Sequence, residues 1–263
     1  MLQYQNEIPV AAHRGNSRYF PENTLAAFRS AFALAPDMIE TDLHMTQDGR
    51  LVLIHDHRVD RTTDGTGLVR EMTLSRIRSL DAGSWKGEQF RGERVPTLEE
   101  FLELAEGAPD MLFNIELKDY PMDSGDFAYR SAALAIDMLR DAGLLSRCVI
   151  NTWSGELNEW LAEKYGEEIM IHAYAPQELM GPNQRRFVYD YAYCVCLFGT
   201  PQSPVEEKFK FDLARGYGVE PWAYFPEEIP ELYDAALANG ARLFTANDPA
   251  WVMEYLRKKG LHR

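Results

Sequence analysis

The chain has 263 residues, 46% of them hydrophobic, which is enough to bury a sizeable core without disulfides. Its 41 acidic and 27 basic residues give a formal net charge of −14, which argues against nucleic acid or an anionic membrane as a partner. No apolar run approaches the roughly 18 residues of a membrane span, and the first residues lack the basic and long apolar regions of a secretory signal. We therefore expect a cytoplasmic protein without stable membrane insertion.

Short apolar runs alternate with longer amphipathic segments along the chain. The predicted strands span residues 8–12, 38–43, 51–54, 111–117, 148–152, 169–173, 193–198, 218–222 and 242–245. The predicted helices span residues 24–35, 97–107, 127–142, 154–164, 204–215, 227–239 and 249–258. Near-continuously apolar strands that alternate with helices are typical of parallel sheets covered on both faces. The pattern predicts an α/β fold, either a TIM barrel or an open doubly wound sheet.

The predicted strands outnumber the eight places of a TIM barrel by one. Runs 38–43 and 51–54 are separated by a short segment that contains Asp48-Gly49, a tight-turn signal. This segment leaves no room for a crossover helix, so we expect the two runs to pair as a hairpin or to depart from a regular βαβ unit.

Residues 60–95 break the alternation of strand and helix. This segment is polar and rich in glycine and arginine. We interpret it as a small insertion within one domain that spans residues 1–263, either a subdomain or a long cap on the barrel mouth. Whether it also carries homodimer contacts stays open at this point.

Charged residues stand at the ends of several predicted strands. The first strand is followed by His13, Arg14 and a glycine turn, at the position where barrel enzymes place their sites. A capping histidine beside a surface arginine would give the same pattern. The run 51–54 is followed in the same way by His55 and Asp56.

Two further strands carry carboxylates within apolar surroundings. Glu40 and Asp42 lie two residues apart, so they share one face of a strand, and they repel each other unless a cation lies between them. Glu116 interrupts the apolar run 111–117, where a lone carboxylate is costly unless it is paired or bound to metal. Lys118 shares its face and would either meet a phosphate oxygen or neutralise Glu116. Together, these strand ends suit the cleavage of a phosphodiester.

These motifs resemble those of the glycerophosphodiester phosphodiesterase family. The resemblance is dense and ordered between residues 13 and 118, and thinner beyond. In chain order the motifs are His13-Arg14-Gly15, Pro21-Glu22-Asn23-Thr24, Glu40-x-Asp42, Thr46-x-Asp48-Gly49, His55-Asp56, Arg61-Thr62-Thr63, Gly65-Thr66-Gly67, Pro96-Thr97-Leu98-Glu99-Glu100, Glu116-Leu117-Lys118, then Trp222 and Thr245-Ala246-Asn247-Asp248-Pro249.

The resemblance implies a TIM barrel of the phospholipase-C-like type, with a small insertion after the His-Asp motif. It implies hydrolysis of glycerophosphodiesters to an alcohol and glycerol 3-phosphate. The same resemblance implies that Glu40, Asp42 and Glu116 bind Mg²⁺ or Ca²⁺. His13 and His55 would be the acid/base pair, and Arg14 and Lys118 would bind the phosphate.

The C-terminal half departs from the family pattern. The chain has Trp222-Ala223-Tyr224-Phe225 where Trp-Thr-Val-Asn is common, so the identity of the alcohol is open. We expect the Trp222 indole to contact the glycerol or an acyl chain, with core packing as the alternative. We interpret His57, His172 and His262 as structural. His44 shares the face of Glu40 and Asp42, so it could support the site from behind, but we favour a solvated or core-edge histidine.

Three other functions compete with this interpretation. A lysophospholipase D would apply the same chemistry to a larger lipid and would need an apolar mouth, which the insertion could provide. A catalytically silent phosphodiester binder would keep the fold, but the complete set of charged residues argues against it. A metal-dependent sugar isomerase could share the barrel.

Overall fold

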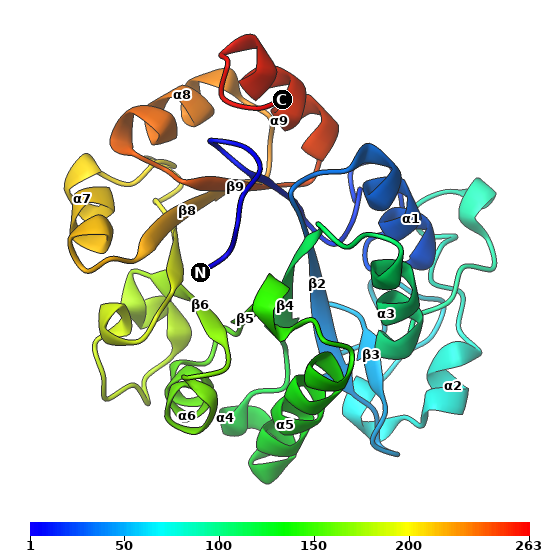
Figure 1. Cartoon of the computed structure of the whole chain (residues 1–263). Helices are drawn as coiled ribbons and strands as arrows, with labels where there is room; N and C mark the ends of the chain where they lie inside the picture. The colour runs from blue at the N-terminus through cyan, green and yellow to red at the C-terminus, as the bar shows by residue number, and fades with distance from the viewer.

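The computed structural model describes all residues, 1–263, and its centre is a closed barrel of eight parallel strands (Figure 1). The strands are β1 (Val10–Ala12), β2 (Met38–Met45), β4 (Leu112–Leu117), β5 (Cys148–Asn151), β6 (Met170–Ala175), β7 (Cys194–Leu197), β8 (Glu220–Phe225) and β9 (Leu243–Ala246). Their order around the barrel follows the chain, and β1 closes the ring by pairing with both β9 and β2. The expectation of a TIM barrel is confirmed.

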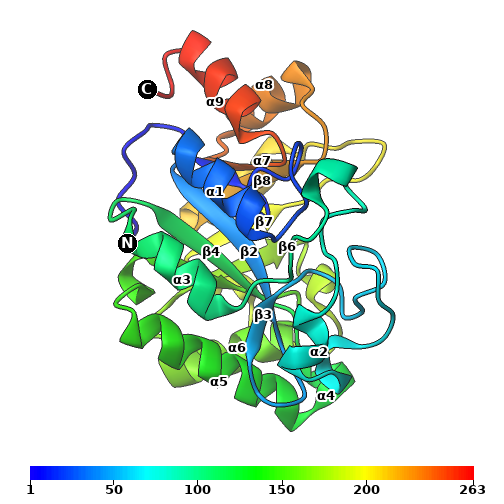
Figure 2. The same ribbon diagram turned by 90° about the vertical axis from the view of Figure 1, so that its right-hand side faces the viewer.

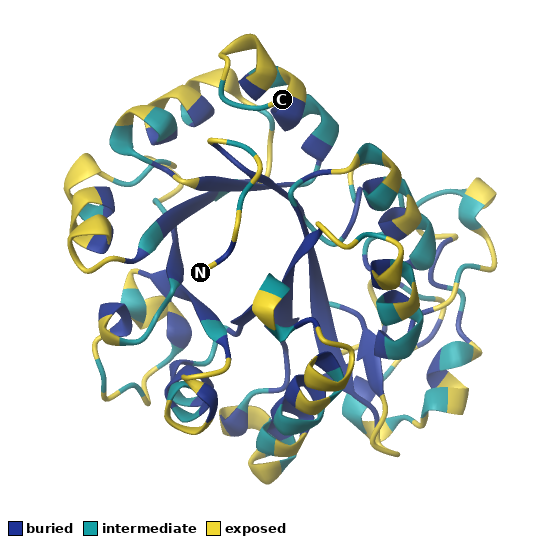
Figure 3. Ribbon diagram, in the orientation of Figure 1, coloured by how far each residue is buried: buried dark blue, intermediate teal, exposed yellow.

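The helices lie outside the barrel, and the longer ones bury one side each against its strands (Figure 3). They are α1 (Leu25–Leu34), α2 (Leu74–Arg78), α3 (Leu98–Glu106), α4 (Pro121–Ser124), α5 (Asp126–Asp141), α6 (Gly155–Tyr165), α7 (Lys208–Gly216), α8 (Pro230–Asn239) and α9 (Pro249–Lys258), with short 3₁₀ turns at η1 (Val69–Glu71), η2 (Glu88–Phe90), η3 (Leu145–Arg147), η4 (Gln177–Met180) and η5 (Val188–Asp190). Thr97 caps α3 in a capping box with Glu100, which satisfies two backbone N–H groups at the helix start. None of the helices combines the length and the apolar character needed to cross a membrane.

The ninth strand, β3 (Leu51–Leu53), runs antiparallel to β2 and lies outside the barrel. Leu43 pairs with Leu53 across the hairpin. Gly49 in the turn has a φ of 75°, a left-handed conformation that glycine adopts at little cost. The predicted hairpin is therefore confirmed, and it carries the chain away from the barrel just before His55.

Residues 60–95 pack beside this hairpin and contain α2 but no strand (Figure 2). Their small apolar cluster includes Val69, Ile77 and Leu80 and rests on Val52 and Ile54. At its far side, Lys86 Nζ donates a hydrogen bond of 2.8 Å to the Ser17 carbonyl in the segment after β1. The insertion thus borders one side of the barrel mouth.

Candidate active site

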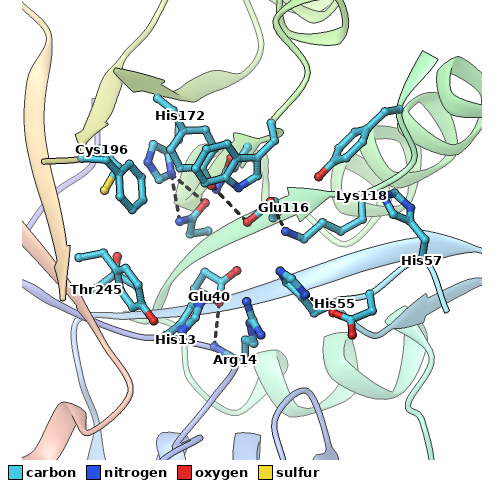
Figure 4. A pocket seen from close by; sticks show the side chains of 18 residues that line it. His13, Arg14, Glu40, His55, His57, Glu116, Lys118, His172, Cys196 and Thr245 are labelled. Atoms are coloured by element: carbon cyan, nitrogen blue, oxygen red, sulfur yellow. Dashed lines mark hydrogen bonds and ion pairs between the residues drawn. The ribbon is translucent and has the colours of Figure 1, made fainter. Parts of the chain in front are cut away.

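A cavity of about 590 Å³ opens at the carboxyl ends of the barrel strands. Figure 4 shows its lining side chains, with Glu40, Lys118 and His55 on one side and Cys196 and Thr245 on another. The lining residues are His13, Arg14, Glu40, His55, Asp56, His57, Asn114, Glu116, Lys118, Tyr120, Asn151, Trp153, His172, Tyr174, Cys196, Phe198, Tyr224 and Thr245. Charged groups from β1, β2 and β4 therefore share one cavity with aromatic groups from the later strands.

Three buried carboxylates meet in the charged part. Asp42 on β2 lies directly opposite Glu116 on β4, because the two strands pair in that register. Glu40 lies two residues before Asp42 on the same face. One ligand oxygen from each of the three lies within 4.8 Å of the others. The strand register, which the sequence does not give, is what brings the third carboxylate to the first two.

Two cationic side chains contact this cluster. Lys118 Nζ forms an ion pair with Glu116 and lies 3.2 Å from Asp42 Oδ1. Arg14 Nε lies 3.2 Å from Asp42 Oδ2, and the Arg14 backbone N–H donates to Glu40 Oε2 at 2.8 Å. Burial raises the pKa of Glu40, and the charges of Asp42 and Glu116 raise it further. Burial would also raise the pKa of Asp42, but Lys118 and Arg14 hold it well below its usual range.

The cluster fits a hard divalent cation. Three carboxylates face two cations, so ionisation of all three leaves a buried negative charge. Glu40 Oε1 is buried without a hydrogen-bond partner, which is costly for a carboxylate oxygen, and Asp42 Oδ1 has only its 3.2 Å ion pair with Lys118. Carboxylate oxygens are the ligands that Mg²⁺ and Ca²⁺ prefer. Glu40, Asp42 and Glu116 could therefore hold such an ion.

His13 lies beside the carboxylates in a fixed orientation. Its Nδ1 is 2.7 Å from Asn247 Oδ1, while the Asn247 amide nitrogen lies 3.2 Å from the Pro226 carbonyl, which can only accept. The amide oxygen therefore faces His13, so Nδ1 carries the proton and Nε2 has a free lone pair. Burial and the neighbouring Arg14 lower the pKa of His13 to about 3, which keeps the ring neutral near pH 7.

His55 belongs to a chain of ion pairs along the cavity rim. Its Nδ1 lies 2.6 Å from Asp56 Oδ1, and Asp56 is bound in turn by Arg61. Arg61 also donates two hydrogen bonds to Glu22, which accepts a 2.7 Å bond from Arg14. Burial lowers the pKa of His55, and the Asp56 hydrogen bond acts in the opposite direction.

Aromatic rings form the other half of the cavity. Trp153 stacks on Tyr174 with ring centroids 3.8 Å apart, and Phe198 packs against both. Tyr224 lies 4.8 Å from the His13 ring. The Tyr174 hydroxyl lies 3.2 Å from Glu116 Oε2, which connects this aromatic wall to the carboxylates.

The comparisons with known proteins agree with this geometry. The sequence profile described as "Glycerophosphoryl diester phosphodiesterase family" matches residues 13–166, more than half of the chain. The chain belongs to this family. It is 56% identical over 109 residues to a glycerophosphodiester phosphodiesterase of Caldanaerobacter subterraneus, an alignment that covers 41% of this chain and 44% of the relative. It is 46% identical over 106 residues to one of Bacillus subtilis, covering 37% of this chain and 36% of the relative. The alignments thus span less than half the length of these curated relatives.

Solved structures match over most of this family member. A glycerophosphodiester phosphodiesterase of Agrobacterium tumefaciens aligns with a TM-score of 0.73 and 26% identity, covering 92% of this chain and 97% of the other. A phosphodiesterase of Oleispira antarctica, solved with the product sn-glycerol-3-phosphate, aligns with a TM-score of 0.80 and 23% identity, covering 95% of this chain and 96% of the other. The similarity to the Oleispira antarctica structure supports the barrel fold of this chain.

One residue expected in the site of this phosphodiesterase-family chain lies elsewhere. The expectation that Trp222 contacts substrate is corrected, because its indole is fully buried and does not line the cavity. β8 continues to Phe225, so Trp222 lies a layer below the strand end, in a cluster with Leu2 and Met38 that fills the barrel's other end. Tyr224, two residues later on the same face, reaches the cavity instead.

Other residues enter the site that were not expected there. His57 and His172, interpreted as structural, both line the cavity. His44 does not line it, but its Nδ1 lies 2.8 Å from Asp119 and its Nε2 3.3 Å from the His55 carbonyl. Asn247 orients His13 from 234 positions away in the chain. The motif that contains Asn247 was the only sequence signal for this last contact.

Proposed function

We propose that this chain hydrolyses glycerophosphodiesters to an alcohol and glycerol 3-phosphate with the help of a divalent cation. The observation that carries the proposal is a group of three buried carboxylates at the barrel mouth. Two histidines and the basic side chains of Arg14 and Lys118 line the same cavity. Membership in the glycerophosphoryl diester phosphodiesterase family supports it. The complete set of these charged side chains speaks against a silent binder.

Glu40, Asp42 and Glu116 would hold the cation, Mg²⁺ or Ca²⁺. When bound, it would polarise a phosphoryl oxygen as a Lewis acid. Arg14 and Lys118 lie beside the same carboxylates, so their nitrogens can share the charge of an arriving phosphate. Without substrate, the Arg14 and Lys118 side chains pair with these carboxylates and reduce the repulsion among the three negative charges.

The two histidines would transfer the protons. Neutral His13 presents the lone pair of Nε2, so it can accept the proton of an attacking hydroxyl, either of water or of the substrate's own glycerol. Asp56 holds His55 Nδ1 and opposes the burial that lowers the pKa of this ring, so the protonated His55 that would donate to the leaving alcohol is the minor form near pH 7. Overall, one water is consumed, one P–O bond forms and the P–O bond to the alcohol breaks.

The first test is release of glycerol 3-phosphate from glycerophosphocholine and glycerophosphoethanolamine. Parallel reactions contain EDTA, Mg²⁺ or Ca²⁺. We expect that EDTA abolishes turnover and that one cation restores it. Turnover that persists in EDTA would refute the cation site, and a folded protein inactive with both substrates and both cations would refute the proposed reaction.

A further inference from the structure

A buried pair of a histidine and a carboxylate lies beside the catalytic cavity and has no role in the chemistry proposed above. His44 on β2 is 1% exposed, and Asp119, two residues after β4, is 5% exposed. His44 Nδ1 lies 2.8 Å from Asp119 Oδ1, and neither side chain lines the cavity. Because burial removes both groups from water, such a pair adds little to stability by itself. Its contacts with neighbouring elements therefore carry the argument for a role.

Asp119 is held firmly on the side away from His44. Its Oδ2 accepts a hydrogen bond of 2.8 Å from the Met45 backbone N–H and one of 2.7 Å from Ser131 Oγ on α5. Asp119 also directly follows Lys118, whose backbone N–H donates to the Leu43 carbonyl at 2.9 Å. One buried carboxylate thus joins β2, α5 and the strand end that carries the phosphate-binding lysine.

The other edge of the His44 ring contacts the segment that follows β3. His44 Nε2 lies 3.3 Å from the His55 carbonyl oxygen. A carboxylate and a carbonyl can only accept, so the His44 ring is surrounded as a donor from both nitrogens. The ring also packs edge-on against His57, with the two ring centroids 5.1 Å apart. His44 therefore supports residues 55–57 at two points.

This segment carries His55 into the cavity outside any regular strand. Figure 4 shows the His55 and His57 rings on the Lys118 side of the cavity. Asp56 holds the His55 ring through Nδ1 at 2.6 Å, but a ring fixed by a neighbour in its own segment still moves whenever that segment moves. The hydrogen bond from His44 to the His55 carbonyl ties the backbone of the segment to the barrel. Together, the two contacts fix the direction in which His55 Nε2 points.

We infer that His44 is a positioning residue, which Asp119 holds in place and which keeps the His55 ring where it can protonate the leaving alcohol. This inference rests on the proposed function, because it assigns His44 to the proton donor of that reaction. The pair connects the strand end that binds the phosphate with the segment that carries the donor. A displacement of the donor by an ångström is enough to lower the rate about 100-fold.

The test compares two substrates that differ in their need for a proton. Glycerophosphocholine releases an alcohol that must be protonated, whereas a p-nitrophenyl ester of glycerol phosphate releases an anion. In His44→Leu, kcat for glycerophosphocholine should fall about 10- to 100-fold, while kcat for the nitrophenyl ester should change less than about twofold. His44→Gln should recover part of the loss, because its amide N–H can take the place of Nε2–H.

The matched control is His262→Leu. His262 forms a similar buried pair, with Nε2 2.9 Å from Asp37 Oδ2 and both side chains 4% exposed, but it lies outside the cavity. Its replacement should leave kcat unchanged for both substrates. This control separates the loss of a buried histidine–carboxylate pair in general from the loss of the contact with His55.

The outcomes separate this inference from the proposed function. Equal losses with both substrates, or no loss with either, overturn the positioning role and leave glycerophosphodiester hydrolysis standing. If His44→Leu does not fold, Asp119→Asn keeps the volume of the side chain and allows the same comparison. If the wild type cleaves neither substrate, the proposed function fails, and crystal structures then decide: a His55 ring that stays in place in His44→Gln overturns the positioning role, and a displaced ring supports it.

Discussion

Arg61 binds Asp56 through two hydrogen bonds, with Nε 2.7 Å from Oδ2 and Nη2 3.0 Å from Oδ1. The same guanidinium donates to both oxygens of Glu22. Asp56 contacts His55 and Glu22 contacts Arg14, so one arginine from the insertion positions two groups of the site that come from different strands. Planar guanidinium groups suit this double pairing, and lysine does not reproduce it.

We therefore expect Arg61→Lys to lower kcat, by up to about 100-fold if the side chains of His55 and Arg14 shift by an ångström. Stability should change little, because the Arg61 side chain is 44% exposed. Steady-state kinetics and thermal unfolding measure the two effects. Arg58→Lys is the matched control, since its pair with Asp60 is also exposed but lies outside the cavity. Equal kinetics in both variants would rule out a positioning role for Arg61.

Glu40→Gln should change cation affinity and stability in opposite directions. Burial and the charges of Asp42 and Glu116 raise the pKa of Glu40, so the cation-free protein should become more stable when this charge is removed. Cation binding should weaken by about tenfold or more, because one anionic ligand is lost. Thermal unfolding in EDTA and calorimetric titration with Mg²⁺ and Ca²⁺ measure the two quantities.

Glu99→Gln provides the control for this pair of measurements. Glu99 binds Arg50 at the surface and lies outside the carboxylate cluster, so its replacement should leave cation affinity unchanged. If Glu40→Gln binds the cation as tightly as the wild type does, Glu40 is not a ligand.

Sequence alone predicted the charged half of the site, for a physical reason. Parallel barrel strands end at one mouth, so residues that directly follow a strand meet there wherever the strands lie in the chain. His13 after β1 and Lys118 after β4 are both of this kind. The hairpin was predictable as well, because Asp48-Gly49 is a local turn signal.

The aromatic half depended on information that the sequence does not contain. Trp222 and Tyr224 share one face of β8, and only the length and register of that strand decide which of them reaches the cavity. The Asn247 side chain contacts His13 only because β9 pairs with β1.

The two proposed histidine roles can be separated with a leaving group that needs no proton. His13→Ala and His55→Ala should each lower kcat for glycerophosphocholine by roughly 10²–10⁴-fold. With a p-nitrophenyl ester of glycerol phosphate, activity should return in His55→Ala and stay low in His13→Ala, because nitrophenolate leaves as an anion. Rescue of His13→Ala instead would exchange the two roles, and full activity of either variant with glycerophosphocholine would remove that histidine from catalysis.

Stability at acidic pH should depend on His172. Its side chain is 3% exposed and contacts Asn114, and burial lowers its pKa to about 3. The unfolded chain, with a histidine pKa of about 6.5, takes up the proton first as pH falls. The stability that His172 confers as a neutral ring is therefore complete above pH of about 6.5 and is lost progressively toward the folded pKa.

His172→Gln removes this titration, so the free energy of unfolding of the wild type should fall relative to the variant by about 2 kcal/mol between roughly pH 6.5 and 5. Urea unfolding of both proteins across this range measures it, and a difference that does not vary with pH would show that His172 is not held neutral by burial.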